Sequence, residues 1–146
     1  MRMQRGFTLL EIVIVLVIAA MAIALVLSFS GKGASAADLK ASARALAAGL
    51  RTAQSTAMAT RRDALLTVDV DAKLFSFSGE DKPRQLPGGV DLKLYTSQAE
   101  VESEKKGSIR FYPDGSSTGG RITVSSGERK YLVDVDWLTG RVSIGE

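Results

Sequence analysis

One acidic side chain stands inside a long apolar run near the start of the sequence. From Phe7 to Phe29 the sequence reads FTLLEIVIVLVIAAMAIALVLSF, in which Glu11 is the single ionisable residue. A charged side chain costs about 2.5 to 3.5 kcal/mol on membrane-insertion scales, so an acid retained in such a segment indicates a function. The chemistry it offers is electrostatic, because a buried carboxylate is tolerated when an opposite charge comes close.

Asp134 and Asp136 form a second candidate group, two residues apart on an expected strand. Two carboxylates on one face of a strand could act as a catalytic pair or bind calcium. Calcium needs six or more oxygen ligands, and the neighbouring sequence offers no such set. We therefore favour solvent-facing acids on a half-buried strand, and we expect no metal site.

The segment FYPDGSSTGGRI, residues 111–122, is rich in glycines and hydroxyls that could cradle a phosphate. It lacks the Gly-Lys-Ser/Thr ending and the strand–loop–helix context of a P-loop. Pro113, Asp114 and Gly115 instead predict a turn, because proline fixes φ, aspartate caps locally and glycine takes conformations that other residues resist.

The composition excludes several classes of site. The sequence has no cysteine and no histidine, which removes disulfides, thiol nucleophiles, histidine bases and cysteine or histidine metal sites. We therefore expect no enzymatic activity and no cofactor. Lysine and arginine total 19 against 16 acids, and this excess of +3 is small and scattered, so it is weak evidence for nucleic-acid binding.

The apolar run fits a membrane span. About 23 helical residues reach roughly 34 Å, enough for a hydrocarbon core of about 30 Å. Positive charge at Arg2 and Arg5 keeps the preceding end in the cytoplasm and sends the rest of the chain to the far side. A cleaved secretory signal is the alternative, because ASA at 34–36 fits its cleavage site. We favour a retained anchor, since the run is longer than a signal's apolar region and contains Glu11.

The residues RGFTLLE, 5–11, resemble the processing site of type IV pilins and of the pseudopilins of type II secretion. The resemblance implies that a membrane-embedded prepilin peptidase cuts after Gly6 on the cytoplasmic side and methylates the new N-terminal amine of Phe7. It also implies that Glu11 pairs with the N-terminal ammonium of a neighbouring subunit during assembly. The alternative for Glu11 is hydration near the membrane interface without a partner.

A helical pattern follows the span. Ser35 and Asp38 have the spacing of a capping box. Apolar residues then recur at helical intervals and predict an amphipathic helix over about 38–62, whose alanine-rich stripe packs against a sheet. These apolar residues are Leu39, Ala43, Leu46, Leu50 and Ala57.

Short alternating segments after the helix predict antiparallel strands. Leu66, Val68 and Val70 mark the first strand, and a turn at 72–73 leads into a second over 74–77, forming a hairpin. Further strands are expected over 90–95, 108–112, 121–125, 130–137 and 140–144. Between them, residues 96–107 are polar and charged, and we expect an exposed loop whose charges serve solvation rather than a site.

Residues 111–122, together with LTGRV at 138–142, resemble the C-terminal signature of minor pseudopilins typified by the H subunit of type II secretion, and of related FimT-like minor pilins. The resemblance implies an α+β, pilin-like fold. In it a long N-terminal helix, half transmembrane and half amphipathic, packs against two small antiparallel sheets. The implied parts are a cleaved leader (1–6), a transmembrane and assembly helix (7–29) and a periplasmic globular domain (30–146).

The function implied by the resemblance is structural. A single-pass inner-membrane subunit of this kind lies at or near the tip of a periplasmic pseudopilus and supports protein export across the outer membrane. Its implied partners are major and other minor pseudopilins, the prepilin peptidase, the inner-membrane assembly platform, the lipid bilayer and secreted exoproteins.

Two other functions stay open. A FimT-like minor pilin would act in pilus assembly or DNA uptake, with basic residues on phosphates. The residues available for this are Arg121, Arg129, Lys130 and Arg141. A hydrolase using carboxylates is the third option, which the missing histidine and cysteine disfavour.

Overall fold

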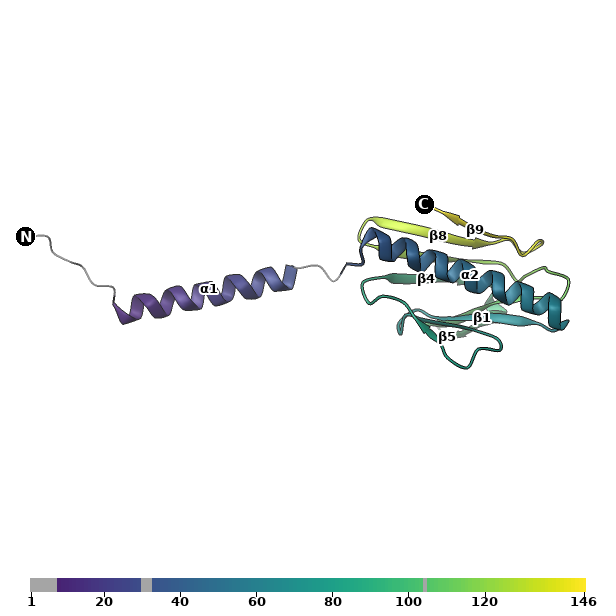
Figure 1. The fold of residues 1–146 in the computed structure, drawn as a ribbon, viewed down its shortest axis with the longest axis horizontal. Helices are drawn as coiled ribbons and strands as arrows, with labels where there is room; N and C mark the ends of the chain where they lie inside the picture. The colour runs from purple at the N-terminus through teal and green to yellow at the C-terminus, as the bar shows by residue number, and fades with distance from the viewer. Residues whose placement is uncertain (1–7, 30–32, 104) are drawn as a thin grey trace, which may run out of the picture. The chain divides into compact units, whose positions relative to one another are not determined.

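The computed structural model describes residues 8–29, 33–103 and 105–146. The chain divides into two units, Met1–Lys32 and Gly33–Glu146. The first unit contains helix α1 (Leu9–Phe29), and the second contains helix α2 (Ala36–Thr60) with two β-sheets (Figure 1). The remaining elements are β1 (Ala64–Asp69), β2 (Leu74–Phe77), β3 (Arg84–Gln85), β4 (Asp91–Thr96), η1 (Gln98–Glu100), β5 (Val101–Ser103), β6 (Lys106–Phe111), β7 (Gly120–Ser126), β8 (Arg129–Val135) and β9 (Val142–Gly145).

Helix α2 begins at a capping box. The hydroxyl of Ser35 accepts a hydrogen bond from Asp38 N at 3.1 Å, and the Asp38 carboxylate accepts one from Ser35 N at 3.2 Å. Two backbone N–H groups that lack a partner within the helix are thereby satisfied. The helix ends at Thr60, where Arg61 takes a left-handed conformation with φ of 53°. Each boundary lies two residues before the one predicted from periodicity.

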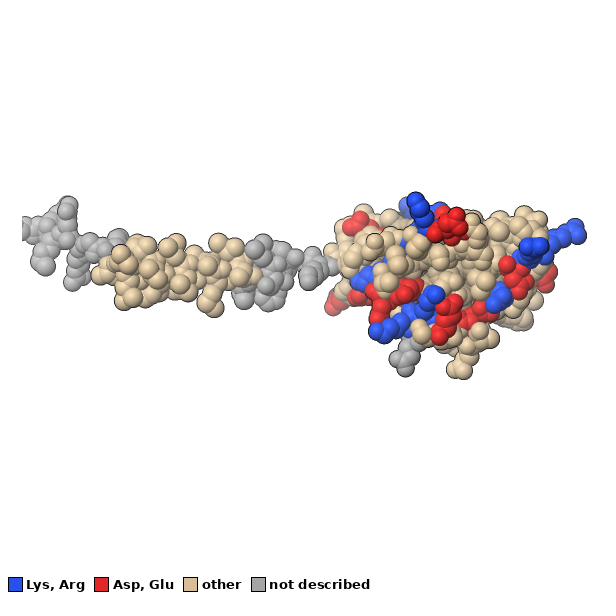
Figure 2. Space-filling model, turned by 90° about the horizontal axis from the view of Figure 1, so that it is seen from below, with Lys and Arg blue, Asp and Glu red and all other residues tan. Residues whose placement is uncertain are grey.

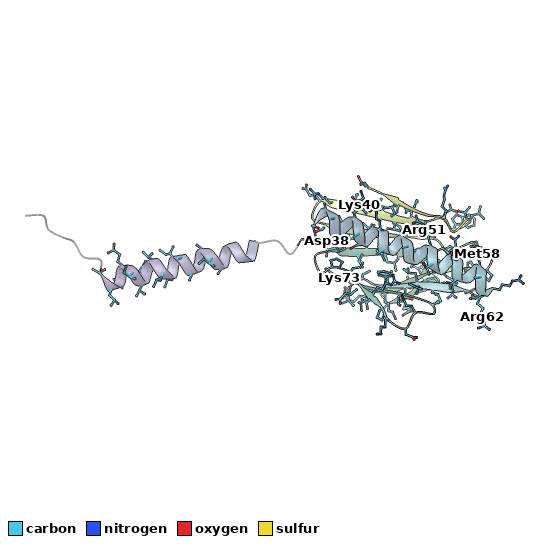
Figure 3. The ribbon with its side chains drawn as sticks, viewed as in Figure 1. Asp38, Lys40, Arg51, Met58, Arg62 and Lys73 are labelled. Atoms are coloured by element: carbon cyan, nitrogen blue, oxygen red, sulfur yellow. The ribbon has the colours of Figure 1, made fainter. Side chains whose placement is uncertain are left out.

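The alanine-rich stripe of α2 is buried and packs against both sheets (Figure 1). Small side chains let the helix approach the strands closely, and Gly49 is one point of close approach. A Cβ added at Gly49 would lie 2.9 Å from the Leu66 side chain on β1. The opposite side carries Lys40, Arg51 and Met58, which are exposed (Figure 3). The buried stripe consists of Leu39, Ser42, Ala43, Leu46, Ala47, Gly49, Leu50, Ala53 and Ala57.

The strands form a five-stranded sheet in the order β3-β2-β1-β6-β5 and a four-stranded sheet in the order β4-β7-β8-β9. The strand pairs in both sheets are antiparallel. The predicted hairpin is present as β1 and β2, with Val68 opposite Phe75. Val68, Ile109 and Val133 are among the buried side chains that face α2 from the two sheets. The expected α+β class, with small antiparallel sheets packed on a helix, is confirmed.

The region 96–107 corrects one expectation from the sequence. Most of its described residues are exposed, as expected, but it is not a loop, because η1, β5 and the start of β6 lie within it. Glu100 in this region is buried, with 8% of its surface exposed. Sequence polarity was misleading here because an acidic side chain turns inward when a basic partner meets it, and that partner, Arg110, lies on β6.

The unit Gly33–Glu146 contains a complete hydrophobic core. The buried hydrophobic residues of the described chain lie between Leu39 and Val142, and together they form a single cluster. A compact unit with its own core can fold without the segment that precedes it.

Candidate assembly and processing site

The expected processing residues, Gly6 and Phe7, lie outside the residues that the structure describes. Cleavage after Gly6 and methylation of Phe7 therefore stay predictions from the sequence.

Glu11 lies in the first turn of α1 and is exposed. Its backbone N–H donates to Thr8 O at 3.0 Å and to the Thr8 hydroxyl at 3.2 Å. Thr8-x-x-Glu11 thus has the spacing of a capping box, a signal that the sequence analysis missed. A carboxylate at this end of a helix also interacts favourably with the helix dipole. Part of the reason for an acid at this position is therefore local.

The side chains around Glu11 on α1 are apolar and exposed. Leu9 is 84% exposed and Leu10 is 69% exposed, and Ile18 further along the helix is 61% exposed. A helix that is apolar on all sides is stable in water only when another apolar surface or lipid covers it. Glu11 is therefore a single charge on a surface suited to burial.

No helix in the described part of the chain is long and apolar enough to cross a membrane. The expected span, 7–29, includes Phe7 and the side chains of residues 25–29, which lie outside the described residues. The transmembrane assignment therefore stays a prediction.

The acids Asp134 and Asp136 both have partners within the fold. Asp134 forms an ion pair with Arg121 on β7. Asp136 accepts hydrogen bonds from the backbone N–H of Thr139 at 2.8 Å and of Leu138 at 3.1 Å. These bonds, first those from Thr139, hold the pKa of Asp136 below its ordinary value. Within the described residues there is no group of three or more side chains that could hold a metal ion.

The glycine-rich segments 111–122 and 138–142 meet at α2. Gln54 on α2 donates to Gly115 O at 2.9 Å and to Thr139 O at 3.1 Å. Gly140 has φ of +63°, and a Cβ added there would overlap the Gly115 carbonyl oxygen. The predicted turn at Pro113–Gly115 is present, with Gly115 at φ of +89°. These glycines serve close packing of two loops on a helix, which explains the composition without a phosphate.

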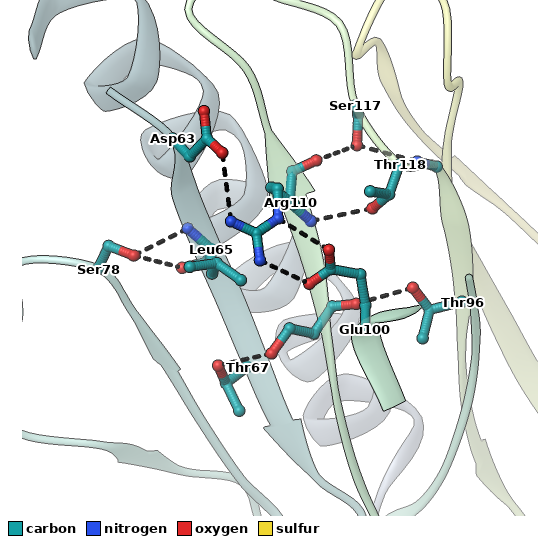
Figure 4. Close-up of polar contacts among 11 residues, drawn as sticks. Asp63, Leu65, Thr67, Ser78, Thr96, Glu100, Arg110, Ser117 and Thr118 are labelled. Atoms are coloured by element: carbon teal, nitrogen blue, oxygen red, sulfur yellow. Dashed lines mark hydrogen bonds and ion pairs between the residues drawn. The ribbon is translucent and has the colours of Figure 1, made fainter. Parts of the chain in front are cut away.

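A partly buried ion-pair network links three parts of the globular unit (Figure 4). Arg110 on β6 donates from Nε to Glu100 Oε1 at 2.8 Å and from Nη2 to Oε2 at 3.3 Å, and its Nη1 donates to Asp63 at 3.2 Å. The hydrogen bond from Arg110 to Glu100 is the main cause that raises the pKa of Arg110. The network joins η1 to β6 and to the connection between α2 and β1. The positions of Asp63, Glu100 and Arg110 in the sequence did not predict this network.

The four basic residues considered for DNA do not gather. Arg121 is paired with Asp134. Arg129 and Lys130 begin β8, whereas Arg141 follows the far end of that strand, about 20 Å away at about 3.3 Å per residue. On the face shown in Figure 2, lysine and arginine side chains are interspersed with acids. The structure therefore contains no basic stripe made of these residues.

Comparison with known proteins identifies the family. The family model described as "Type II transport protein GspH" matches residues 42–140, more than half of the chain. The model described as "Prokaryotic N-terminal methylation motif" matches residues 1–27. Type II secretion system protein H of Xanthomonas campestris pv. campestris is 32% identical over 145 residues, which cover 99% of this chain and 85% of that protein.

Solved structures show the same fold at low sequence identity. The minor pseudopilin EpsH from the type 2 secretion system of Vibrio cholerae has a TM-score of 0.59 and 14% identity, covering 73% of this chain and 95% of its own. The type IV minor pilin FimU of Pseudomonas aeruginosa has a TM-score of 0.56 and 16% identity, covering 74% and 88%. The fold is thus common to pseudopilins and minor pilins, whereas the sequence match distinguishes between them. The chain belongs to the GspH family of type II transport proteins, and it is a minor pseudopilin of the H type.

Proposed function

We propose that this protein is a structural subunit at or near the tip of a periplasmic pseudopilus, where it supports protein export across the outer membrane. In this proposal the precursor is cut after Gly6, Phe7 becomes the methylated N-terminus, and residues 7–29 stay in the inner membrane until assembly. The globular unit lies in the periplasm, and the partners are other pseudopilins. The role is mechanical and requires no cofactor.

One observation carries the proposal. Glu11 is an exposed carboxylate in the first turn of α1, and the large side chains described on this helix, from Leu9 to Ile23, are apolar and exposed. Removing such a helix from lipid and packing it among similar helices leaves the carboxylate in a low-dielectric environment, which is costly unless a positive charge meets it. The N-terminal ammonium of a neighbouring subunit would supply that charge and would also define the register between subunits.

The processing step is tested by mass spectrometry of the mature protein from membranes. We expect an N-terminal peptide that begins with methylated Phe7. A mature chain that begins downstream of Phe29 would contradict the proposal, because it would make this an exported soluble protein.

The assembly role is tested with two substitutions of Glu11. Glu11→Ala removes both the charge and the capping carboxylate. Glu11→Gln removes the charge but keeps a residue that suits the capping box with Thr8. We expect both variants to insert into the membrane and both to be lost from sheared or cross-linked pseudopili. Normal incorporation of Glu11→Gln would show that capping, rather than charge pairing, is the role of this residue.

A FimT-like role in pilus assembly or DNA uptake is the second candidate, and the likeness to FimU favours it. It is tested by retention of duplex DNA on immobilised residues 33–146 across a salt series. Retention that falls steeply with salt, and that Arg129→Ala with Lys130→Ala removes, would support this second role. We expect no retention at physiological salt, because the four basic residues are dispersed or paired.

A further inference from the structure

A small pocket lies where the first half of α2 meets β8 and β9. It is lined by Lys40 and Arg44 on α2, Tyr131 on β8, Ile144 on β9 and Glu146. Lys40 lies near the start of the helix (Figure 3). The pocket has a volume of about 240 Å³. Pockets that enclose a whole small-molecule ligand usually have about 300 to 1,000 Å³, so this one suits a compact group.

Helix periodicity places the two cations of the lining on the same side of α2. Residues four apart lie one turn from each other, so Lys40 and Arg44 are neighbours on the helix surface. Both side chains are exposed. Like charges at this spacing repel each other and destabilise a helix, and an anion bound between them would remove that repulsion.

A third cation comes from β8. Arg129 and Tyr131 lie two residues apart and therefore on the same face of the strand. Val133 lies on this face as well and is buried in the core that includes α2. Lys130 lies on the opposite face of the strand. Arg129 therefore extends from β8 on the side where α2 packs, and Lys130 does not.

Two arginines act on the Tyr131 hydroxyl. Partial burial and the neighbouring Glu146 carboxylate raise the pKa of this hydroxyl, whereas Arg129 and Arg44 act to lower it. Both guanidinium groups therefore lie close enough to the ring for their charges to affect it. We call Lys40, Arg44 and Arg129, around Tyr131, the cationic cluster.

The charges of the cationic cluster are not neutralised by ion pairs within the part of the chain that the structure describes. None of Lys40, Arg44 and Arg129 has a carboxylate within ion-pair distance there. Glu146 is the acid that lines the pocket, so three cations face one acid. The cluster therefore has an excess of positive charge, which attracts anions.

We propose that the cationic cluster binds the phosphate of an anionic phospholipid headgroup at the membrane surface. An arginine can donate two parallel hydrogen bonds to phosphate oxygens, and a lysine adds a point charge. The tyrosine hydroxyl can donate to the same oxygens. A compact phosphate group also suits the size of the pocket.

The length of the chain favours a lipid over phosphate free in solution. From Phe29 to Ala36 the chain can reach at most about 25 Å. A segment 7–29 held in lipid would therefore keep the start of α2 near the headgroups. The inference rests on this proposed anchorage. Binding of headgroups would hold the globular unit at the membrane before assembly.

The main experiment measures the chemical labelling of Lys40 in the full chain. The protein is reconstituted in vesicles of phosphatidylcholine, with or without phosphatidylglycerol, and treated with an uncharged, water-soluble amine reagent. Mass spectrometry of peptides gives the labelling of each lysine. Lys82, an exposed residue outside the cluster, is the internal reference. We expect the ratio of Lys40 to Lys82 labelling to fall at least about threefold when phosphatidylglycerol is present.

Two variants and a matched control decide whether the cationic cluster is responsible. Arg44→Gln and Arg129→Gln should each restore the labelling of Lys40 in vesicles with phosphatidylglycerol. Lys130→Gln removes the same charge beside Arg129 but from the opposite face of β8, and it should leave Lys40 protected. Circular dichroism confirms that each variant is folded.

A second arm separates a lipid headgroup from free phosphate. It uses the globular unit, residues 33–146, which contains its own core, with inorganic phosphate as the probe. We expect saturable NMR shifts of the amides around Lys40 at millimolar phosphate, and we expect Arg44→Gln to remove them. Phosphate binding without an effect of phosphatidylglycerol on Lys40 would overturn the lipid and assign the cluster to free phosphate.

Equal labelling of Lys40 in both kinds of vesicle, with no shift by phosphate, would overturn the proposal. Equal protection in Arg44→Gln and Lys130→Gln would also overturn it, because it would indicate a general effect of the charged surface. Retention of duplex DNA that Arg44→Gln removes, without an effect of phosphatidylglycerol, would replace the lipid by nucleic acid. Any of these results in a chain that begins at methylated Phe7 would contradict this inference and leave the filament role intact.

Discussion

Glu100 is the charged side chain that the described part of the chain buries, and its partners explain why. Both carboxylate oxygens accept hydrogen bonds from Arg110, in a bidentate arrangement that suits guanidinium and carboxylate geometry. Arg110 is itself held by Asp63, which is 43% exposed. The Glu100–Arg110 pair thus links η1 to β6, in a segment where most side chains are exposed.

Replacing Glu100 with glutamine should destabilise the globular unit by about 1 to 3 kcal/mol, because the variant leaves part of the Arg110 charge without a partner. Asp63→Asn should cost about 1 kcal/mol or less, because that pair is more exposed. Denaturant titration of residues 33–146 measures both values. Glu102→Gln is the control, since Glu102 pairs with Lys106 on the surface. Equal losses of unfolding free energy for Glu100→Gln and Glu102→Gln would contradict the claim that the buried pair stabilises the fold more than the exposed pair.

Two aspartates should make the stability depend on acidic pH. Asp136 accepts backbone hydrogen bonds from Thr139, and Asp114 is bonded by the hydroxyl and backbone of Ser116, so the pKa of each lies below its ordinary value of 3.8. A lowered pKa in the folded state stabilises the fold above the unfolded pKa, and this contribution is lost as pH falls through the folded pKa. We therefore expect the free energy of unfolding to fall below about pH 4.

The test of this pH dependence is denaturant titration between about pH 6 and pH 2.5. Asp136→Asn and Asp114→Asn should each have a shallower loss than the wild type. Asp91→Asn is the control, because the Asp91 side chain is 75% exposed and its carboxylate lies 3.6 Å from the Lys73 ammonium. A slope that neither Asp136→Asn nor Asp114→Asn changes would assign the acid sensitivity to other groups.

At the scale of elements, the C-terminal loops are held by α2 rather than by each other's side chains. Gln54 bonds to one carbonyl in each loop, and Ser117 N donates to Trp137 O at 2.9 Å between them. Arg51, one turn earlier on α2, donates to Val142 O at 3.2 Å. The helix therefore positions the loops at the end of the four-stranded sheet.

Gly140→Ala tests this packing. The substitution should cost about 2 to 4 kcal/mol, because alanine is strained at φ of +63° and its Cβ would overlap Gly115 O and the Gln54 side chain. Gly127→Ala is the matched control, with φ of +60° and open space around it, and should cost about 1 kcal/mol. The difference in unfolding free energy between the two variants measures the overlap alone. Equal costs would show that the loops can move apart without loss.

At the scale of the whole molecule, the two units differ in what stabilises them. The buried cluster of the described chain lies within Gly33–Glu146, whereas the large apolar side chains described on α1, from Leu9 to Ile23, are exposed. Apolar area contributes about 25 cal/mol per Å² only when it is removed from water. Burial of apolar surface therefore stabilises the globular unit in water. The apolar surface of α1 adds to stability only when lipid or another apolar surface covers it.

Removal of residues 1–32 should leave the globular unit folded. We expect a cooperative thermal transition for residues 33–146, with a midpoint within a few degrees of the same transition in the detergent-solubilised full chain. Ser35→Ala in the shorter chain should lower the unfolding free energy by about 1 kcal/mol, because Ser35 caps α2. A non-cooperative transition for residues 33–146 would contradict an independent unit.

Local patterns were sufficient for much of this molecule. The capping box at Ser35, the amphipathic helix, the hairpin around residues 72–73 and the turn at Pro113–Gly115 are all signalled by neighbours in the chain. Each depends on interactions within a few residues, where spacing alone specifies the geometry. The processing motif is of the same kind, because a peptidase recognises a short linear segment.

Other features were decided only when distant segments met. Residues 96–107 look solvated, yet Glu100 is buried because Arg110 lies on the adjacent strand. The dispersal of the basic residues and the two loops bonded by Gln54 likewise depend on the order β4-β7-β8-β9. Whether a polar side chain is solvated or paired depends on which partner lies within about 3 Å, and strand order rather than local sequence determines that partner.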